Sequence, residues 1–310
     1  MLRQVVLRLL TGVVVVLGAA TVTFAAVRLI PGDIALAIAG GPETQPTPEV
    51  LEVIRAENGL NEPLITQYLG YLGRLLTGDL GTSYRLGSPV AQAIGEQVGA
   101  TLLLAGAALL VAVVISFTVA LLTAGRSRRA RGLSSTLELL FASTPTFWLG
   151  LILLSVFSYW LGWLPSISSA NPLSLILPAV TLGLPIAGLL TQVLRGALED
   201  ALEQPFIVSA RARGLGETGV RVGHALRHSL VPYLTMSGFV VGALLGGAVI
   251  TETLFARQGI GRLLLTSVLS KDLPVVIGIV LLSAAVFTIV NLAVDLVHPL
   301  LDRRLKAVTL

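Results

Sequence analysis

Long apolar runs alternate with short polar segments along this chain, and the lengths of the runs predict membrane-spanning helices. A helix that crosses the hydrocarbon layer needs about 20 mostly apolar residues. Six stretches meet that length: residues 9–30, 98–124, 136–161, 173–194, 232–256 and 275–297. A closed β-barrel would need short alternating segments, whereas the second stretch contains LLLAGAALLVAVVISFTVALL. The pattern therefore predicts an all-α, polytopic membrane protein with six transmembrane helices.

The composition supports the membrane class. Of the 310 residues, 54% are hydrophobic and only 12% are charged, whereas a soluble globular chain carries about 25% charged residues. The sequence pI near 9.8 could suggest nucleic-acid binding, but that function needs basic residues gathered on one solvated patch. Here they form short clusters between apolar runs, so no nucleic-acid partner is expected. Cysteine is absent, which excludes disulfides and thiolate metal ligands.

The Lys and Arg residues beside the six stretches predict the orientation, because cytoplasmic loops carry an excess of them. One side collects fourteen: Arg3, Arg8, Arg126, Arg128, Arg129, Arg131, Arg195, Arg211, Arg213, Arg221, Arg227, Arg303, Arg304 and Lys306. The other side collects six: Arg55, Arg74, Arg85, Arg257, Arg262 and Lys271. The bias predicts that both termini are cytoplasmic. The first stretch could instead be a cleaved signal peptide, but its run exceeds the usual ~7–15 apolar residues, which favours an uncleaved anchor.

The polar segment 31–97 is then external, and it carries helix signals. Thr47 followed by Pro48 gives an N-cap and a first-turn proline, and Gly59 can end that helix. These signals argue against a bare linker between the first two spans.

A second helix of this segment is expected to start at Asn61–Pro63 and to continue to Gly78, and Ser88–Pro89 starts a third. The apolar residues of the second helix recur at spacings of three and four, which predicts one buried face. They are Tyr68, Leu69, Leu72, Leu75 and Leu76. We interpret residues 31–97 as a small helical cap on the outer ends of the spans, with a flexible loop of fraying helices as the alternative.

The chain lacks the sequence motifs of a nucleotide site. A phosphate-binding P-loop needs Gly-x-x-x-x-Gly-Lys-Ser/Thr, but the only two lysines, Lys271 and Lys306, are followed by Asp272 and Ala307. No His-Glu-x-x-His zinc motif and no Gly-x-Ser-x-Gly motif is present, and the three histidines are scattered. The chain is therefore not expected to be an enzyme or to hold a metal or other cofactor.

An ion-coupled secondary transporter is an alternative function. Such proteins place ionisable residues inside the membrane, where a charge is costly and usually marks function. The candidates are Glu138, Glu252, Asp295 and His298. All four lie near the ends of the predicted spans, where the cost is small, so interfacial or helix-capping roles are favoured. No inverted repeat of broken helices is evident either.

One polar insert, FIVSARARGLGETGVRVGHALRHSLVP at residues 206–232, separates two apolar runs. Pro205 fits a first helical turn, Gly214 fits the left-handed position after a helix, and residues 216–218 restart a second helix that ends where Pro232 opens the next span. The insert is thus expected to form a helix–turn–helix with one apolar and one basic face. Taken alone, these features fit binding to anionic lipid and docking to a protein equally well.

The same insert resembles the cytoplasmic coupling loop, or EAA loop, of ABC importer membrane subunits, and the chain is most similar to the dipeptide/oligopeptide/nickel permease family. The first match is Ser209-Ala210-Arg211-Ala212-Arg213-Gly214-Leu215 with the family run T-A-R-A-K-G-L, and the second is His224-Ala225-Leu226-Arg227-His228 with Pro232. Further matches are Leu29-Ile30-Pro31-Gly32-Asp33, Gly78-Asp79-Leu80-Gly81, Ile250-Thr251-Glu252, Gly259-Ile260-Gly261-Arg262 and Asp272-Leu273-Pro274-Val275.

These matches follow one another in order over nearly the whole chain, with four departures from the family pattern. Val208 replaces the glutamate of the general EAA motif, Ile34 and Gln258 replace prolines, and His228 replaces asparagine. None of these departures involves the glycine of the loop, so they leave the implied class intact.

The resemblance implies a type I ABC importer permease in the cell membrane of a prokaryote. It implies a first helix at 1–30, the external cap at 31–97, and a permease core at 98–310 with a coupling loop at about 199–231. The implied partners are a second, related permease subunit, two cytoplasmic ATP-binding subunits that hydrolyse the ATP, an external substrate-binding protein and membrane lipid.

The resemblance also implies a solute and the residues that contact the motor. A peptide-like solute is expected, with nickel complexes, glutathione and glycans as alternatives. The residues implied in ATPase coupling are Ser209, Ala210, Arg211, Ala212, Arg213, Gly214, Leu215, His224 and Arg227.

Overall fold

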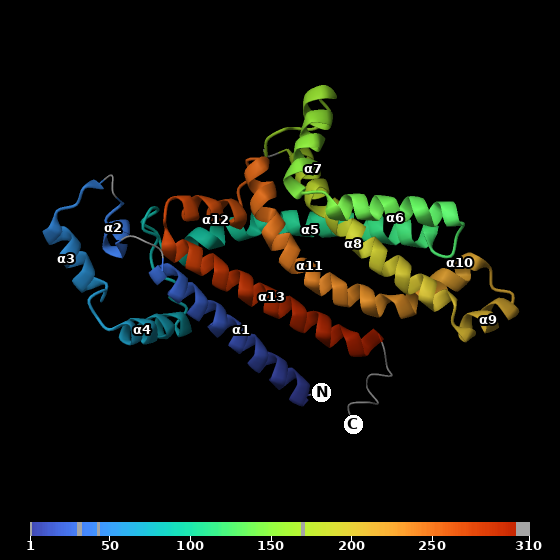
Figure 1. Cartoon of the computed structure of the whole chain (residues 1–310), viewed down its shortest axis with the longest axis horizontal. Helices are drawn as coiled ribbons and strands as arrows, with labels where there is room; N and C mark the ends of the chain where they lie inside the picture. Colours follow the sequence, from blue (N-terminus) through green and yellow to red (C-terminus); the bar gives the residue numbers. More distant parts are fainter. Residues whose placement is uncertain (1, 30–32, 42–43, 169–170, 302–310) are drawn as a thin grey trace. The chain divides into compact units, whose positions relative to one another are not determined.

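The computed structural model describes residues 2–29, 33–41, 44–168 and 171–301, and within these residues the fold is all-α (Figure 1). The helices are α1 (Leu2–Leu29), α2 (Ile34–Ile38), α3 (Pro48–Glu57), α4 (Leu64–Leu76), α5 (Val90–Thr123), α6 (Arg128–Ser143), α7 (Thr146–Leu153), α8 (Ile176–Leu202), α9 (Pro205–Ala212), α10 (Glu217–Val220), α11 (Leu226–Leu254), α12 (Ile260–Leu269) and α13 (Leu273–Leu301). Short π-helical or 3₁₀ turns are η2 (Leu154–Trp160), η3 (Pro172–Leu175) and η4 (Arg221–Ala225). Arg303, Arg304 and Lys306, which we used to predict orientation, lie outside the described residues.

Four helical segments of the described chain are long and apolar enough to cross a membrane: Val90–Thr123, Pro172–Leu202, Glu217–Leu254 and Leu273–Val297. A fifth span is possible if the bent pair Arg128–Ser143 and Thr146–Trp160 counts as one. Helix α1 contains an apolar segment, Leu10–Ala26, that is shorter than these candidate spans. The polytopic all-α class is thus confirmed, and the number six stays a prediction.

The predicted uninterrupted span 136–161 is wrong, because the chain bends by 103° between α6 and α7. The bend follows Thr144, which has extended dihedral angles (φ −77°, ψ 125°), and Pro145, which precedes α7. A residue before proline is pushed out of the helical region by the proline ring. The apolar run therefore holds two helices of different direction.

The predicted start of a span at Pro232 is also wrong. The helical path begins at Glu217 and continues through η4 into α11, so Pro232 lies inside a helix. Pro185 likewise lies inside α8. Membrane helices tolerate such prolines because neighbouring groups satisfy the freed backbone atoms.

The predicted helices of the segment 31–97 are confirmed, with their ends near the expected residues. α3 starts at Pro48 after Thr47, and Gly59 follows it with a positive φ of 61°. α4 ends before Gly78, whose φ is 77°. The expected third helix is the beginning of α5, which is continuous from Val90 to Thr123. Helices α2 and α12 were not predicted.

The predicted buried face of α4 is wrong for part of its length. No residue of α4 is buried, and Leu69 and Leu76 are 60% and 85% exposed. The contacts that α4 does make are with α1: the ring of Tyr68 lies 5.3 Å from the ring of Phe24, and its hydroxyl lies 2.7 Å from the Thr21 hydroxyl. A single neighbouring helix covers only one side of α4.

The chain divides into two compact units, one of residues 101–258 with 289–301 and the other of residues 2–100 with 259–288. In the first unit, α5, α8 and α11 share a core that includes Leu104, Leu190 and Val240. A Cβ on Gly183 of α8 would lie 2.6 Å from the backbone oxygen of Ala108 in α5. Small residues permit this close backbone approach, which is typical of membrane helix pairs.

In the second unit, Asp272 fixes a loop before α5. Asp272 is 2% exposed and accepts hydrogen bonds from the Ser83 hydroxyl and from the amides of Tyr84 and Arg85, the latter two at 3.1 and 3.3 Å. The aspartate of the Asp272–Val275 match is thus the anchor of a neighbouring loop.

Candidate functional site

The predicted coupling segment folds as a helix, a tight turn and a second helix, as the sequence indicated (Figure 1). α9 starts with Pro205 in its first turn, where the missing N–H costs no hydrogen bond. Gln204 before it is extended (φ −76°, ψ 147°), which separates α9 from the end of α8. Only Glu203 and Gln204 lie between these two helices.

Gly214 ends α9 in the left-handed conformation, with φ 82°. Its N–H donates to the carbonyl of Arg211 at 2.9 Å, and the N–H of Leu215 donates to the carbonyl of Ala210 at 3.4 Å. These two bonds make a Schellman motif, in which the left-handed residue is usually glycine. The predicted role of Gly214 as the residue that ends the helix is therefore confirmed.

One face of the segment belongs to the core of the first unit. Ile207 and Ala210 of α9 are fully buried, together with Val220 of α10 and Ala225 of η4. They belong to the same apolar cluster as Leu198 of α8. α9 is thus held firmly against the helical bundle by burial of its apolar side chains.

The opposite face of α9 is open to solvent. Val208 is 65% exposed, and Ser209, Ala212 and Arg213 are exposed beside it. Leu215, just after the glycine, is 39% exposed. A short helix that is anchored on one face leaves the side chains of its other face available for contact with another molecule. The predicted residues Ser209–Leu215 therefore lie together on one short element and its cap, except that Ala210 points into the core.

Arg211 makes an ion pair across the turn that the sequence analysis did not predict. Its Nε donates to Oε1 of Glu217 at 2.9 Å and its Nη2 donates to Oε2 at 3.3 Å. This hydrogen bonding raises the pKa of the Arg211 guanidinium above its usual value. Both side chains are about half exposed, so solvent screens the pair and its contribution to stability is small. The pair links α10 to α9 across the turn.

The other two predicted residues lie on the second helical segment. His224 is partly buried, and its Nδ1 has no hydrogen-bond partner within the described chain; Arg227 is exposed. The ring of His228 lies 4.6 Å from the ring of Phe206, which joins the start of α11 to α9. Arg221, which is not among the predicted coupling residues, is only 6% exposed and lies in η4 with the buried Ala225.

Two of the four ionisable residues considered for a secondary transporter have separate hydrogen-bond partners within the described chain. Glu138 pairs with Arg195 at 2.8 Å, and Glu252 is fully buried and accepts a hydrogen bond from Thr101 at 2.6 Å. Asp295 lies on α13, and the side chain of His298 is outside the described residues. Among the described residues no group of three or more His, Cys, Asp or Glu side chains is arranged to hold a metal ion.

Comparison with known proteins gives a consistent result over the whole chain. Residues 116–307 match the family model described as "Binding-protein-dependent transport system inner membrane component", and residues 1–105 match the model for the N-terminal part of such membrane components. A peptide transport system permease protein of Brucella abortus (strain 2308) is 37% identical over 309 residues, which cover 96% of this chain and 97% of that protein. The glutathione transport system permease protein GsiC of Salmonella paratyphi A is 36% identical over 307 residues, 99% of each chain. GsiC of Escherichia coli O6:H1 is 35% identical over the same shares.

Proposed function

Because the chain belongs to the family of binding-protein-dependent transport system inner membrane components, we propose that it forms half of the solute path of an ATP-driven importer of peptides. The protein is an ABC importer permease, a multi-pass subunit of the prokaryotic cell membrane, and it works with ATPase and substrate-binding components. The names of its relatives refer to peptide and to glutathione, itself a tripeptide. A peptide-like solute is the chemistry that these names share.

The observation that carries the proposal is the geometry of α9. An element that transmits force from a separate motor must be stiff, and it must present a surface for the motor to hold. The burial of Ile207 and Ala210 supports stiffness, and the exposure of Val208 and Arg213 supports a contact surface. We assign this outer face of α9, with Ser209, Ala212 and Leu215, to the contact with an ATP-binding subunit.

The roles of the remaining predicted residues differ in this proposal. Ala210 anchors α9, Gly214 ends it, and Arg211 holds the turn through Glu217. Arg211 therefore acts mainly within the chain, whereas Arg213 is the basic residue that meets the ATPase. We assign His224 and Arg227 to the edge of the same contact.

The proposed assembly holds this chain, a second related permease, two cytoplasmic ATP-binding subunits and an external substrate-binding protein, all within membrane lipid. The chain supplies no P-loop of its own, so the ATPase subunits hydrolyse the ATP. The charge bias supports a topology in which the coupling segment and both termini are cytoplasmic and residues 31–97 are outside.

The experiment that tests the docking assignment adds a charge to the outer face of α9. Ala212→Glu should accumulate normally, since the side chain is exposed, but it should reduce copurification of the ATP-binding subunits at least tenfold. The matched control is Ala56→Glu, at an exposed alanine of α3. Full ATPase attachment in the Ala212→Glu protein would overturn the assignment and favour a lipid-binding segment.

The orientation is tested in the same chain, which contains no cysteine. Single cysteines at Arg128 and Thr77 can be labelled with a membrane-impermeant maleimide in intact cells. Thr77 is preferred to its neighbour Gly78, because the positive φ of Gly78 would be strained by a side chain. We expect labelling at position 77 only, and labelling at position 128 would reverse the proposed topology.

A further inference from the structure

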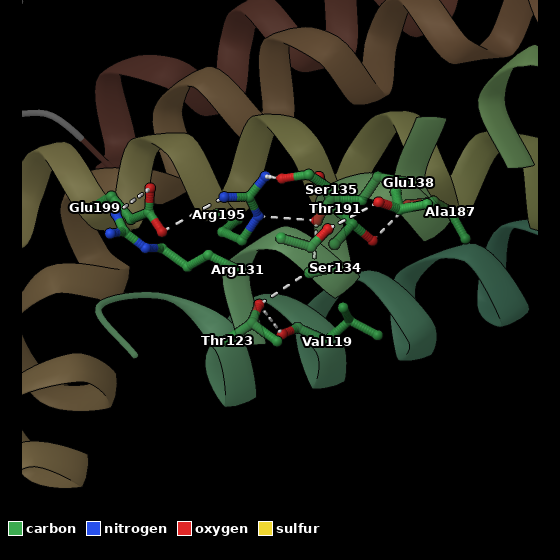
Figure 2. Close-up of polar contacts among 12 residues, drawn as sticks. Val119, Thr123, Arg131, Ser134, Ser135, Glu138, Ala187, Thr191, Arg195 and Glu199 are labelled. Atoms are coloured by element: carbon green, nitrogen blue, oxygen red, sulfur yellow. Dashed lines mark hydrogen bonds and ion pairs between the residues drawn. The ribbon is translucent and has the colours of Figure 1, made fainter. Parts of the chain in front are cut away.

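A buried ion pair joins α6 to α8, outside the coupling segment (Figure 2). Nε and Nη2 of Arg195 donate to the two oxygens of Glu138, both at 2.8 Å. The Glu138 side chain is 4% exposed and that of Arg195 is 12% exposed. A bidentate pair of this kind fixes both the separation and the relative rotation of the two side chains.

Neighbouring hydroxyl groups complete the pair. The Ser134 hydroxyl donates to Oε1 of Glu138 at 2.5 Å, and Nη2 of Arg195 donates to the Ser135 hydroxyl at 2.9 Å. Farther out, Nη1 of Arg195 donates to Glu199 at 3.5 Å, and Glu199 also lies 4.0 Å from Arg131. Figure 2 shows these groups as one row between the two helices. α6 therefore cannot slide or turn on α8 without breaking several directed bonds.

A second contact holds the same two helices about two turns away along α8. A Cβ on Gly188 would lie 2.7 Å from the backbone oxygen of Glu138 and 3.1 Å from the backbone nitrogen of Ala142. The backbones are thus in direct contact there, whereas at Arg195 the helices are joined by side chains. Two fixed points on one helix define a rigid pair.

The end of α8 is mechanically continuous with α9. Leu198 and Ala201 of α8 lie in the same buried cluster as Ile207 and Ala210 of α9. A displacement of α9 must therefore move the last turns of α8, where Arg195 lies. α6 leads in turn into the bent pair α6–α7, whose helices differ in direction by 103°.

We propose that the Glu138–Arg195 pair is a positioning element that makes α6 follow α8 when the coupling helix moves. Glu138 and Arg195 are then positioning residues, which contact neither the ATPase nor the solute. This inference rests on the proposed function, because it assumes that an ATPase displaces α9. It adds the route by which that displacement reaches the α6–α7 bend.

The directed bonds, rather than packing alone, are what the proposal requires. Well-packed apolar residues of similar volume can replace a buried ion pair with little loss of stability. A double variant, Glu138→Leu with Arg195→Met, therefore separates stability from positioning. The apolar pair fills the space, but it has no preferred register along the helices and should let α6 slip on α8.

The experiment uses the complete importer reconstituted in vesicles and measures peptide uptake per ATP hydrolysed. Glu138→Gln, Arg195→Lys and the apolar double variant should each assemble with the ATP-binding subunits, and each should reduce this ratio at least fivefold. The double charge reversal, Glu138→Arg with Arg195→Glu, should recover part of the ratio. The control is Glu96→Gln, which removes an exposed carboxylate of α5 and should leave the ratio unchanged.

The possible outcomes distinguish failure of the positioning role from failure of the proposed function. If the wild-type complex assembles and the apolar double variant transports with the wild-type ratio, the positioning role is overturned and the pair is only structural. If Glu138→Gln does not accumulate, Arg195→Lys, which keeps the charge, still decides the question by the same ratio. If the wild-type chain binds no ATP-binding subunit, the proposed function itself fails.

Discussion

The conformation of Gly214 gives the sharpest test of the coupling segment, because its effect can be calculated before the experiment. With φ at 82°, an L-residue at this position is strained. No heavy atom lies within 4 Å of an added Cβ, so the whole cost of a substitution comes from the backbone. That cost is about 1–2 kcal/mol for an ordinary residue, less about 0.4–1 kcal/mol regained from the unfolded chain.

This net cost is small beside the total stability of a folded domain, which is about 5–15 kcal/mol. Gly214→Ala and Gly214→Val should therefore insert and accumulate. The chain can relieve the strain only by leaving the left-handed region, and the Schellman bonds to Arg211 and Ala210 would then be lost. α10 would turn to a new direction, and the Arg211–Glu217 pair would open.

We expect solute-stimulated ATP hydrolysis to fall in the order Gly214→Asn, Gly214→Ala, Gly214→Val, with the valine variant least active. Asparagine adopts positive φ more readily than other residues with a side chain, and β-branched residues are the least tolerant. The matched control is Gly216→Ser in the same turn. Gly216 has an extended conformation (φ −67°, ψ 158°) at the N-cap of α10, where serine is favourable.

The assay is ATP hydrolysis by the reconstituted complex with and without binding protein and peptide. Stimulation at the wild-type level in the Gly214→Val complex would refute the argument from backbone strain. Equal loss in the asparagine and valine variants would also refute it, since that result would indicate a blocked surface and not a strained turn.

Two further predictions concern stability, measured as the apparent melting temperature in detergent. Gly188→Ala should lower the melting temperature by the equivalent of about 1–3 kcal/mol of overpacking, because the new Cβ would meet backbone atoms of α6. The control Gly196→Ala in the same helix has open space and should be neutral or stabilising. A neutral Gly188→Ala would contradict the close approach of the two helices. Asp272→Asn should lower stability by about 1.5–3 kcal/mol, since hydrogen bonds to a charged acceptor are lost, including that from Ser83. Asp79→Asn affects only an exposed contact to a single amide and should change the melting temperature little. Equal melting temperatures for these two variants would refute the role of Asp272 as an anchor.

The features that were predicted well from the sequence are those that depend on one or two residues adjacent along the chain. The start of α3 at Pro48, the positive φ of Gly59 and Gly78, and the end of α9 at Gly214 each depend on the backbone preferences of one or two residues. Proline and glycine restrict or widen the allowed dihedral angles whatever the rest of the chain does. Such signals can therefore be interpreted without knowledge of the tertiary fold.

Pairings between distant residues were not predictable from the same signals. Glu138 and Arg195 are 57 positions apart, and Thr101 and Glu252 are 151 apart. Each residue was visible only as a polar group near the end of an apolar run, and nothing in a single sequence specifies which run lies beside which. Even Arg211 and Glu217, six positions apart, pair only because Gly214 reverses the chain between them.

The bend between α6 and α7 shows why hydropathy alone predicted the third span wrongly as one uninterrupted helix. The run 136–161 stays apolar through Thr144 and Pro145, so its side chains give no sign of a break. In an apolar environment, a break must satisfy the backbone groups that it frees. The Thr144 hydroxyl donates to the carbonyl of Leu140 at 2.5 Å, and the Thr144 amide donates to that of Phe141 at 3.4 Å. Those freed carbonyls are thus satisfied locally, so α6 can end at Thr144 and Pro145 inside an apolar run without leaving these backbone acceptors unpaired.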